Sequence, residues 1–196
     1  MCAREVEKSG ARTISLAAAC GHRSLPCESL PPSLMLHAIA EEGKSSMLRS
    51  LMQTSDDRIP MLARLALGIV ILPHGAQKML GWFGGPGIDG ALGAYASLGI
   101  PAFLGWLAIV TEFVGGLALI VGFLGRVAAF AVALDMIVAV ITQHWAMGFF
   151  MNWNGELRGE GFEFHILAVT LALIVMIRGS GALSIDHALT TRPVAT

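Results

Sequence analysis

The sequence predicts an all-α integral membrane protein, a four-helix bundle that follows a disordered N-terminal extension. Of the 196 residues, 55% are hydrophobic and only 14% are charged, whereas soluble domains carry about 25% charged residues. Much of the charge lies in the first 60 residues, and four long apolar stretches occupy most of the remainder. A chain this apolar cannot bury its side chains within one water-soluble core of this size.

The first segment, residues 1–46, mixes charged residues with Ser and Pro and has no sustained hydrophobic period. We interpret this segment as disordered from its composition. Its apolar run at Ile14–Cys20 is too short to span a bilayer, and a signal peptide needs a longer apolar core directly after a basic start. The three cysteines all lie here, at Cys2, Cys20 and Cys27. Redox chemistry in the membrane part therefore cannot use a thiol of this chain.

Four apolar stretches predict the membrane helices. A helical span needs about 20 apolar residues, and lipid accepts only helices or closed barrels, because backbone groups must be bonded within the protein. The apolar runs do not alternate as barrel strands do. The fourth run is the shortest, and together the runs form one domain, 47–189, with a C-terminal tail at 190–196. The helices are expected at about residues 59–80, 102–124, 127–145 and 162–178.

Glycine-rich joints separate the predicted helices. Gly81–Pro101 is expected to be a long first loop, Gly125 and Arg126 a tight turn, and Met147–Gly161 a second long loop. The first loop contains a GxGxxG pattern at residues 85–90. A dinucleotide site needs that pattern between a strand and a helix, and here it follows a membrane helix, so we discard it.

The charge distribution predicts the orientation of the helices. A net charge of -1 excludes a protein that binds nucleic acid electrostatically. Cytoplasmic loops of membrane proteins carry an excess of Lys and Arg, and this bias places both termini in the cytoplasm and the two long loops outside. We interpret two of the arginines, Arg64 and Arg178, as anchors that extend toward the interface. The bias rests on Arg58, Arg64, Arg126 and Arg178.

Ionisable side chains inside the predicted helices are the candidates for function. Such a residue near the bilayer centre costs about 2.5–3.5 kcal/mol on insertion scales, so each one requires a partner. His74 and Lys78 are four residues apart and share one helix face. Glu112 and Asp135 fall near mid-depth. The candidate polar intramembrane site consists of His74, Lys78, Glu112, Asp135 and Glu163.

Two interpretations of these residues stay open. In the first, they form a proton relay or a pocket for a quinone headgroup, with Glu112 and Glu163 as carboxylates and His74 as the titrating group. The side chains of these three residues should then converge. In the second, Lys78 pairs with Glu163 and Asp135 pairs with a hydroxyl such as that of Thr142, and the network only holds the helices together. No catalytic residue is assigned.

A metal site is not predicted. His and carboxylate side chains are suitable ligands for transition metals, but no close pair such as HxxxH is present among them. The residues whose side chains could serve as metal ligands are His74, Glu112, His144, Glu163 and His165.

Several motifs resemble those of DoxX-type membrane proteins. The resemblance covers about Met47 to Leu189. The first helix is similar through Arg64–Gly68, Pro73–Lys78 and the following Gly81–Gly85, the second through Glu112–Gly116, and the fourth helix and tail through Gly161–Glu163 and Gly179–Asp186.

The resemblance implies a four-helix protein of the cell inner membrane. The family takes its name from a subunit of a thiosulfate:quinone oxidoreductase, and some members are linked to membrane oxidoreductase complexes. We therefore expect a quinone-linked oxidoreductase subunit that acts with partner proteins in the lipid. No motif for a flavin, haem or iron–sulfur cluster is present, so redox work would need a quinone or a partner subunit. The alternative is a non-enzymatic scaffold or a carrier of protons or small molecules.

The start of the resemblance suggests a second interpretation of residues 1–46. Met47 could be the true start of the protein, with the preceding residues a mis-annotated extension. Either way, we expect residues 1–46 to be dispensable for insertion.

The predicted orientation can be tested with a reporter at the C-terminus. Alkaline phosphatase, which is active only outside the cytoplasm, should stay inactive when it is fused after Thr196, because the arginine bias places that end inside. A cytoplasm-active reporter at the same position serves as the control. Strong phosphatase activity would contradict the orientation.

Overall fold

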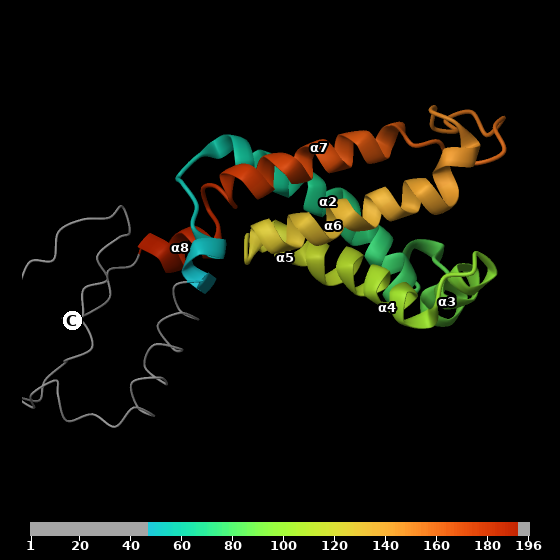
Figure 1. The fold of residues 1–196 in the computed structure, drawn as a ribbon, viewed down its shortest axis with the longest axis horizontal. Helices are drawn as coiled ribbons and strands as arrows, with labels where there is room; N and C mark the ends of the chain where they lie inside the picture. The colour runs from blue at the N-terminus through green and yellow to red at the C-terminus, as the bar shows by residue number, and fades with distance from the viewer. Residues whose placement is uncertain (1–46, 192–196) are drawn as a thin grey trace, which may run out of the picture. The chain divides into compact units, whose positions relative to one another are not determined.

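The computed structural model describes residues 47–191, and every regular element among them is helical (Figure 1). The predicted all-α class is confirmed. The predictions for residues 1–46 and for the last five residues of the tail concern parts of the chain outside the described residues. A short helical stretch at residues 47–52 precedes the first long helix.

The first long helix, α2 (Arg58–Leu80), has clear start and stop signals. Asp57 caps its N-terminus, since the Asp57 carboxylate accepts a hydrogen bond of 2.9 Å from the Ile59 amide. Side-chain oxygens at this position pair amides that the helix itself leaves free. The helix ends at Gly81, whose φ of 69° lies in the left-handed region that glycine adopts at low cost.

The second and third long helices each contain a π-helical turn. The second consists of α4 (Ala102–Val110), the π-turn η3 (Thr111–Gly115) and α5 (Gly116–Val121). The third consists of α6 (Gly125–Ala139), the π-turn η4 (Val140–His144) and the 3₁₀ turn η5 (Trp145–Met147). π-Turns are rare and often mark functional positions, and here η3 contains Glu112.

The fourth long helix, α7 (Glu163–Arg178), packs against α6 and α2. A short helix, α8 (Ile185–Thr191), follows it. In Figure 1, α7 and α6 lie side by side, and α8 is at the end of the bundle where α5 turns into α6.

Three helices of the described part are long and apolar enough to cross a membrane, namely Arg58–Leu80, Ala102–Val121 and Gly125–Met147. The helix α7 has 16 residues and is therefore about 24 Å long at the α-helical rise per residue, less than the roughly 30 Å of a bilayer core. The fourth span thus stays a prediction, although its sequence is apolar and its place in the bundle is clear.

The first loop differs from its prediction as an irregular segment. It contains the 3₁₀ turn η2 (Trp82–Gly84) and an eleven-residue helix, α3 (Gly87–Ser97). The glycines that suggested a loop concentrate at its ends, where Gly81, Gly87 and Gly99 have positive φ angles. Between them the residues from 88 to 97 are mostly helix-compatible, and α3 packs on α2 and α4.

The interior of the bundle contains many small side chains beside a few large ones such as Leu67 and Leu119, while many other large apolar side chains point outward. Ala129 and Ala172 are fully buried at the contact of α6 and α7, whereas Leu134, Ile141 and Leu167 are more than half exposed. Small residues allow membrane helices to approach closely. A water-soluble protein would bury the large side chains, so this arrangement is that of an integral membrane protein.

Arg64 is buried and does not extend to the interface as predicted. Only 1% of its surface is exposed. Its guanidinium donates to the carbonyls of Leu119 (2.8 Å) and Ile120 (2.5 Å) at the end of α5. It also reaches the segment after α7, where it bonds to the carbonyls of Ser180 (2.8 Å), Ala182 (3.3 Å) and Leu183 (2.7 Å). The last carbonyls of a helix have no hydrogen-bond partner within the helix. Arg64 supplies the missing donors at the end of α5.

Asp186 performs the complementary task at the start of α6. Its carboxylate accepts hydrogen bonds from the amides of Leu124 (2.8 Å) and Gly125 (2.9 Å) and from the Ser180 hydroxyl (2.5 Å). A carboxylate at a helix N-terminus pairs free amides and interacts favourably with the helix dipole. We call Arg64, Ser180 and Asp186 the inner clasp, because they join α2, α5, α6 and α8 at one end of the bundle.

The inner clasp predicts a large effect of Arg64→Met on stability. The substitution leaves buried carbonyls unpaired, and each such group costs about 1–3 kcal/mol. We expect a loss of about 3 kcal/mol or more and a clearly lower Tm in detergent, measured by tryptophan fluorescence. The control is Arg58→Met, at an exposed position where substitutions change stability by about 0.5 kcal/mol or less. Equal Tm values for the two variants would contradict the role of Arg64.

Candidate functional site

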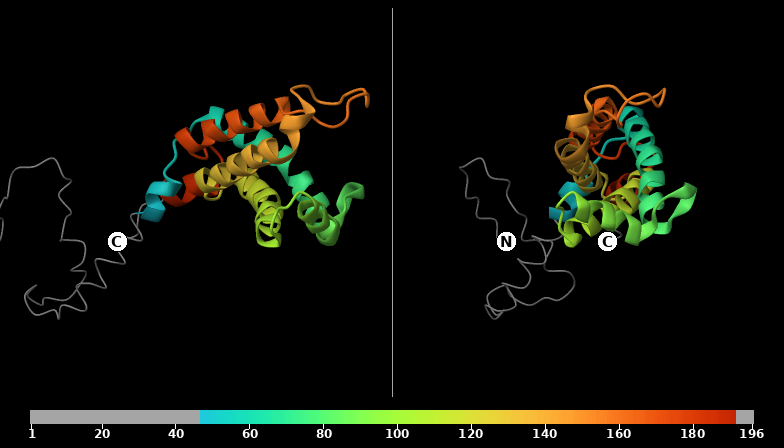
Figure 2. Two further views of the ribbon diagram at one scale, coloured as in Figure 1. Left: turned by 45° about the vertical axis from the view of Figure 1, so that its right-hand side comes forward. Right: turned by 90° about the vertical axis from the view of Figure 1, so that its right-hand side faces the viewer.

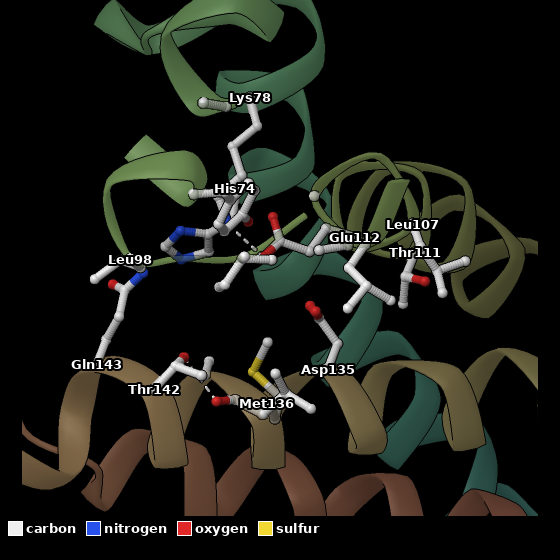
Figure 3. A pocket seen from close by; sticks show the side chains of 18 of the residues that line it. His74, Lys78, Leu98, Leu107, Thr111, Glu112, Asp135, Met136, Thr142 and Gln143 are labelled. Atoms are coloured by element: carbon white, nitrogen blue, oxygen red, sulfur yellow. Dashed lines mark hydrogen bonds and ion pairs between the residues drawn. The ribbon is translucent and has the colours of Figure 1, made fainter. Parts of the chain in front are cut away.

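A cavity of about 880 Å³ lies between the membrane helices. Residues of α2, α4, η3, α6 and α3 form its walls, and most of them are apolar (Figure 3). Its polar side chains include four of the five predicted site residues: His74, Lys78, Glu112 and Asp135.

The centre of the polar cluster is an ion pair between Lys78 of α2 and Glu112 of η3. The Lys78 ammonium donates to Oε1 of the Glu112 carboxylate. Glu112 is only 4% exposed, and its second oxygen, Oε2, is buried without a hydrogen-bond partner in the described part of the chain. A buried carboxylate oxygen without a partner is energetically costly, so a hydrogen-bond donor brought to this atom would stabilise it.

Glycines bring the two helices of this ion pair close together. A Cβ atom on Gly75 would lie 2.6 Å from the carbonyl carbon of Glu112, and one on Gly116 would lie 2.9 Å from the amide nitrogen of Leu72. The backbones of α2 and of the π-turn therefore touch directly. This contact places Lys78, one turn after Gly75, beside Glu112.

Asp135 and His74 reach the same cavity from two other directions. The Asp135 carboxylate points from α6 toward Glu112, and the His74 ring lies on the α2 side of the cavity (Figure 3). Thr142, the expected hydroxyl partner of Asp135, donates instead to the Val138 carbonyl of its own helix at 2.8 Å. The local pairing of Asp135 and Thr142 is therefore not formed.

Glu163 lies outside this cluster. Its Oε1 accepts hydrogen bonds from the Met151 amide (2.9 Å) and the Trp153 indole (3.3 Å), so it fastens the second loop to the start of α7. The structure brings together His74, Lys78, Glu112 and Asp135 and leaves Glu163 apart. The alternative ion pair of Lys78 with Glu163 is not formed either, since Lys78 bonds to Glu112.

Two histidines that were not among the five candidates also line the cavity. His144 of η4 and His165 of α7 have their ring centroids 4.2 Å apart. Nδ1 of His144 donates to the Glu160 carbonyl at 2.7 Å, and Nδ1 of His165 is buried without a partner among the described residues. Both residues occur in the sequence as polar groups near helix ends, but nothing in their spacing indicates that they meet.

Tyr95 also lines the cavity. It lies on α3, and the Lys78 ammonium is 5.9 Å from the centre of its ring. Burial raises the pKa of the Tyr95 phenol, and the nearby Lys78 charge opposes that rise. The unexpected helix α3 thus adds an uncharged hydrogen-bonding group to the cavity.

The chemistry available here is proton transfer and hydrogen bonding. Carboxylates, imidazoles, an ammonium and a phenol can each hold or release a proton. Within the described residues no group of three or more His, Cys, Asp or Glu is arranged to hold a metal ion.

The comparisons with known proteins include a match to one family model. The DoxX family model matches residues 59–145, the part that contains α2, the second helix and α6. The chain is thus an integral membrane protein that carries a DoxX domain, and the resemblance noted from its motifs is confirmed. The search of curated proteins and that of solved structures gave no significant match.

The helix contact beneath the site gives a testable prediction. Gly75→Ala places a methyl group against the backbone of η3, and overpacking of this kind costs about 1–3 kcal/mol. We expect a lower Tm in detergent, because α2 must move away from Glu112. The matched control is Gly93→Ala on α3, where a Cβ atom meets nothing within 4 Å. A Gly75→Ala protein as stable as Gly93→Ala would contradict the close approach.

Proposed function

We propose that the cavity binds the headgroup of a lipid-soluble quinone and that the chain is a subunit of a quinone-linked membrane oxidoreductase. The observation that carries this proposal is the Lys78–Glu112 ion pair at the wall of a largely apolar cavity, with Oε2 of Glu112 unpaired. Ligand sites typically combine apolar walls with a few convergent polar groups.

The residues of the cavity are compatible with a quinone ring. Such a ring has two apolar faces and two carbonyl oxygens that accept hydrogen bonds. Leu98, Ile100 and Leu104 provide apolar contacts. The donors are the Lys78 ammonium, the Tyr95 phenol and the His74 imidazole, which surround the same space.

Reduction of a quinone to a quinol takes two electrons and two protons. In the proposal, a redox partner subunit supplies the electrons. The protons come from side chains of this cavity: His74 and Asp135 face the ring as proton donors, and Glu112, ionised in its pair with Lys78, accepts a hydrogen bond from the quinol hydroxyl that forms. General acids and bases must lie within hydrogen-bond reach of the proton they transfer, or one water away, and these three residues line one space.

The distribution of basic residues supports an inner-membrane protein with cytoplasmic termini. Arg178 pairs with Asp57 at 2.6 Å, and the Arg126 guanidinium donates to the Gln53 carbonyl. These basic residues therefore gather at the end of the bundle opposite to the cavity. By the positive-inside rule that end is cytoplasmic, and the cavity is in the outer half of the bilayer.

A carrier of protons or small molecules is the alternative, and ionisable residues that face a cavity between membrane helices are compatible with it. The two functions differ in what the purified protein retains. A quinone site holds a quinone, whereas a proton carrier needs no such ligand.

The proposal predicts that Glu112→Gln loses quinone. The substitution removes the carboxylate that holds the Lys78 ammonium in place as a donor to the quinone carbonyl, and hydrogen bonds to charged groups contribute about 1.5–3 kcal/mol. Bound quinone per protein, measured by extraction and chromatography after purification in mild detergent, should fall by about tenfold or more. The fold should persist, because the amide still forms hydrogen bonds.

Two controls make this test specific. Glu156→Gln, an exposed change in the second loop, should leave bound quinone unchanged. His74→Ala combined with Glu112→Gln should lose less binding free energy than the sum of the single changes, by about 0.5–3 kcal/mol, as residues of one network do. A wild-type protein without quinone, or a Glu112→Gln protein that retains it fully, would contradict the proposed function.

A further inference from the structure

The two ends of the cavity differ in chemistry. The ion pair of Lys78 and Glu112, with Asp135 and His74, occupies the end against α2. The opposite side is lined by apolar residues of α4 and α6. These are Leu104, Leu107, Phe130, Leu134 and Val138.

The apolar side of the cavity is an opening between two helices. The second and third long helices meet at the turn of residues 122–125, and from there α4 and α6 diverge toward the outer end (Figures 1 and 2). Figure 2 shows the yellow-green α4 leaving the gold α6 at a wide angle. Close contacts of α6 with this helix involve η3 and α5. No described segment fills the space between α4 and α6.

The residues at this opening line the cavity and are at the same time exposed. Leu107 is 60% exposed, Phe130 55% and Leu134 51%. Both helices belong to segments long and apolar enough to cross the membrane, so these side chains face lipid rather than water. The cavity is therefore open sideways to the bilayer.

The outer end of the cavity is covered in a different way. The helix α3 and the segment after it contribute Tyr95, Leu98 and Ile100 to the lining. Since α3 packs on α2 and α4, it lies over the polar cluster on the side of the outer loops. The sideways opening is therefore the route that leads from the cavity directly to the lipid.

We propose that the ligand of this cavity is an amphiphile whose apolar tail passes between α4 and α6 into the lipid while its polar headgroup lies at the Lys78–Glu112 ion pair. This inference rests on the proposed quinone function. It adds the route by which the ligand enters and the place of its apolar tail. The ligand enters from the bilayer through the opening. A headgroup with a tail can then bind only if the space beside Leu107 and Leu134 is free.

The test uses purified protein in lipid nanodiscs and two probes. One is a ubiquinone with a short isoprenoid tail, and the other is the same benzoquinone ring without the tail. Leu134→Trp fills the opening from the side of α6. It should weaken binding of the tailed quinone by about tenfold or more, while binding of the tail-less ring changes by less than about twofold. Retained binding of the ring also shows that the variant is folded.

Two further variants complete the experiment. Leu107→Trp fills the opening from α4 and should reproduce the selective loss. Leu173→Trp, on the exposed face of α7 and away from the cavity, should change neither affinity. If both probes bind the wild type and Leu134→Trp and Leu107→Trp weaken neither of them, or weaken both equally, the proposed route is overturned and the quinone function stands. If neither probe binds the wild type, the quinone function fails and the inference fails with it.

Discussion

The close contact of α2 with the π-turn of the second helix is the constraint on which the rest of the structure depends. Gly75 and Gly116 permit it, because a side chain at either position would collide with the opposite backbone. Only at this separation can Lys78 reach Glu112 and neutralise a carboxylate that is almost fully buried. Without the partner, a charge at this depth would destabilise the membrane helix.

The two ends of the bundle are organised in opposite ways. At the inner end, every strong donor and acceptor of the clasp is used: Arg64 pairs carbonyls of α5 and of the segment after α7, and Asp186 pairs the first amides of α6. Fully satisfied buried networks hold a structure rigidly. At the other end, the helices diverge, and polar atoms of Glu112 and His165 have no hydrogen-bond partner among the described residues. A rigid base thus supports an open cavity.

The different roles of the two ends of the bundle explain where charged residues lie in the membrane part. Arg64 is as buried as Glu112, yet it contributes to stability and faces no cavity, while Lys78 and Glu112 border one. Burial of a charge in a membrane helix is therefore insufficient evidence for a site. What distinguishes the proposed quinone site is that its polar atoms face unfilled space and that this space opens, between α4 and α6, to the phase in which a quinone is dissolved.

The sequence alone determined the all-α class, the first three membrane helices and the resemblance to DoxX proteins. Long apolar runs can only become helices in lipid, so the limits of the first three agree with the structure to within a few residues. The same reasoning identified Lys78, Glu112, Asp135 and His74 as residues that need partners, because an unpaired ionisable group within the lipid is costly.

Only the tertiary structure decided which partners these residues have. One interpretation of the sequence paired Lys78 with Glu163, but the contact at Gly75 places Lys78 beside Glu112. In the sequence, Arg64 occupies a position near a helix end that is typical of an interfacial anchor. Its burial follows from the return of residues 180–183 to the bundle. The helix α3, the meeting of His144 with His165 and the opening between α4 and α6 depend on crossing angles and rotations of helices. Hydrophobicity along a chain does not encode these angles, since they result from packing between distant segments.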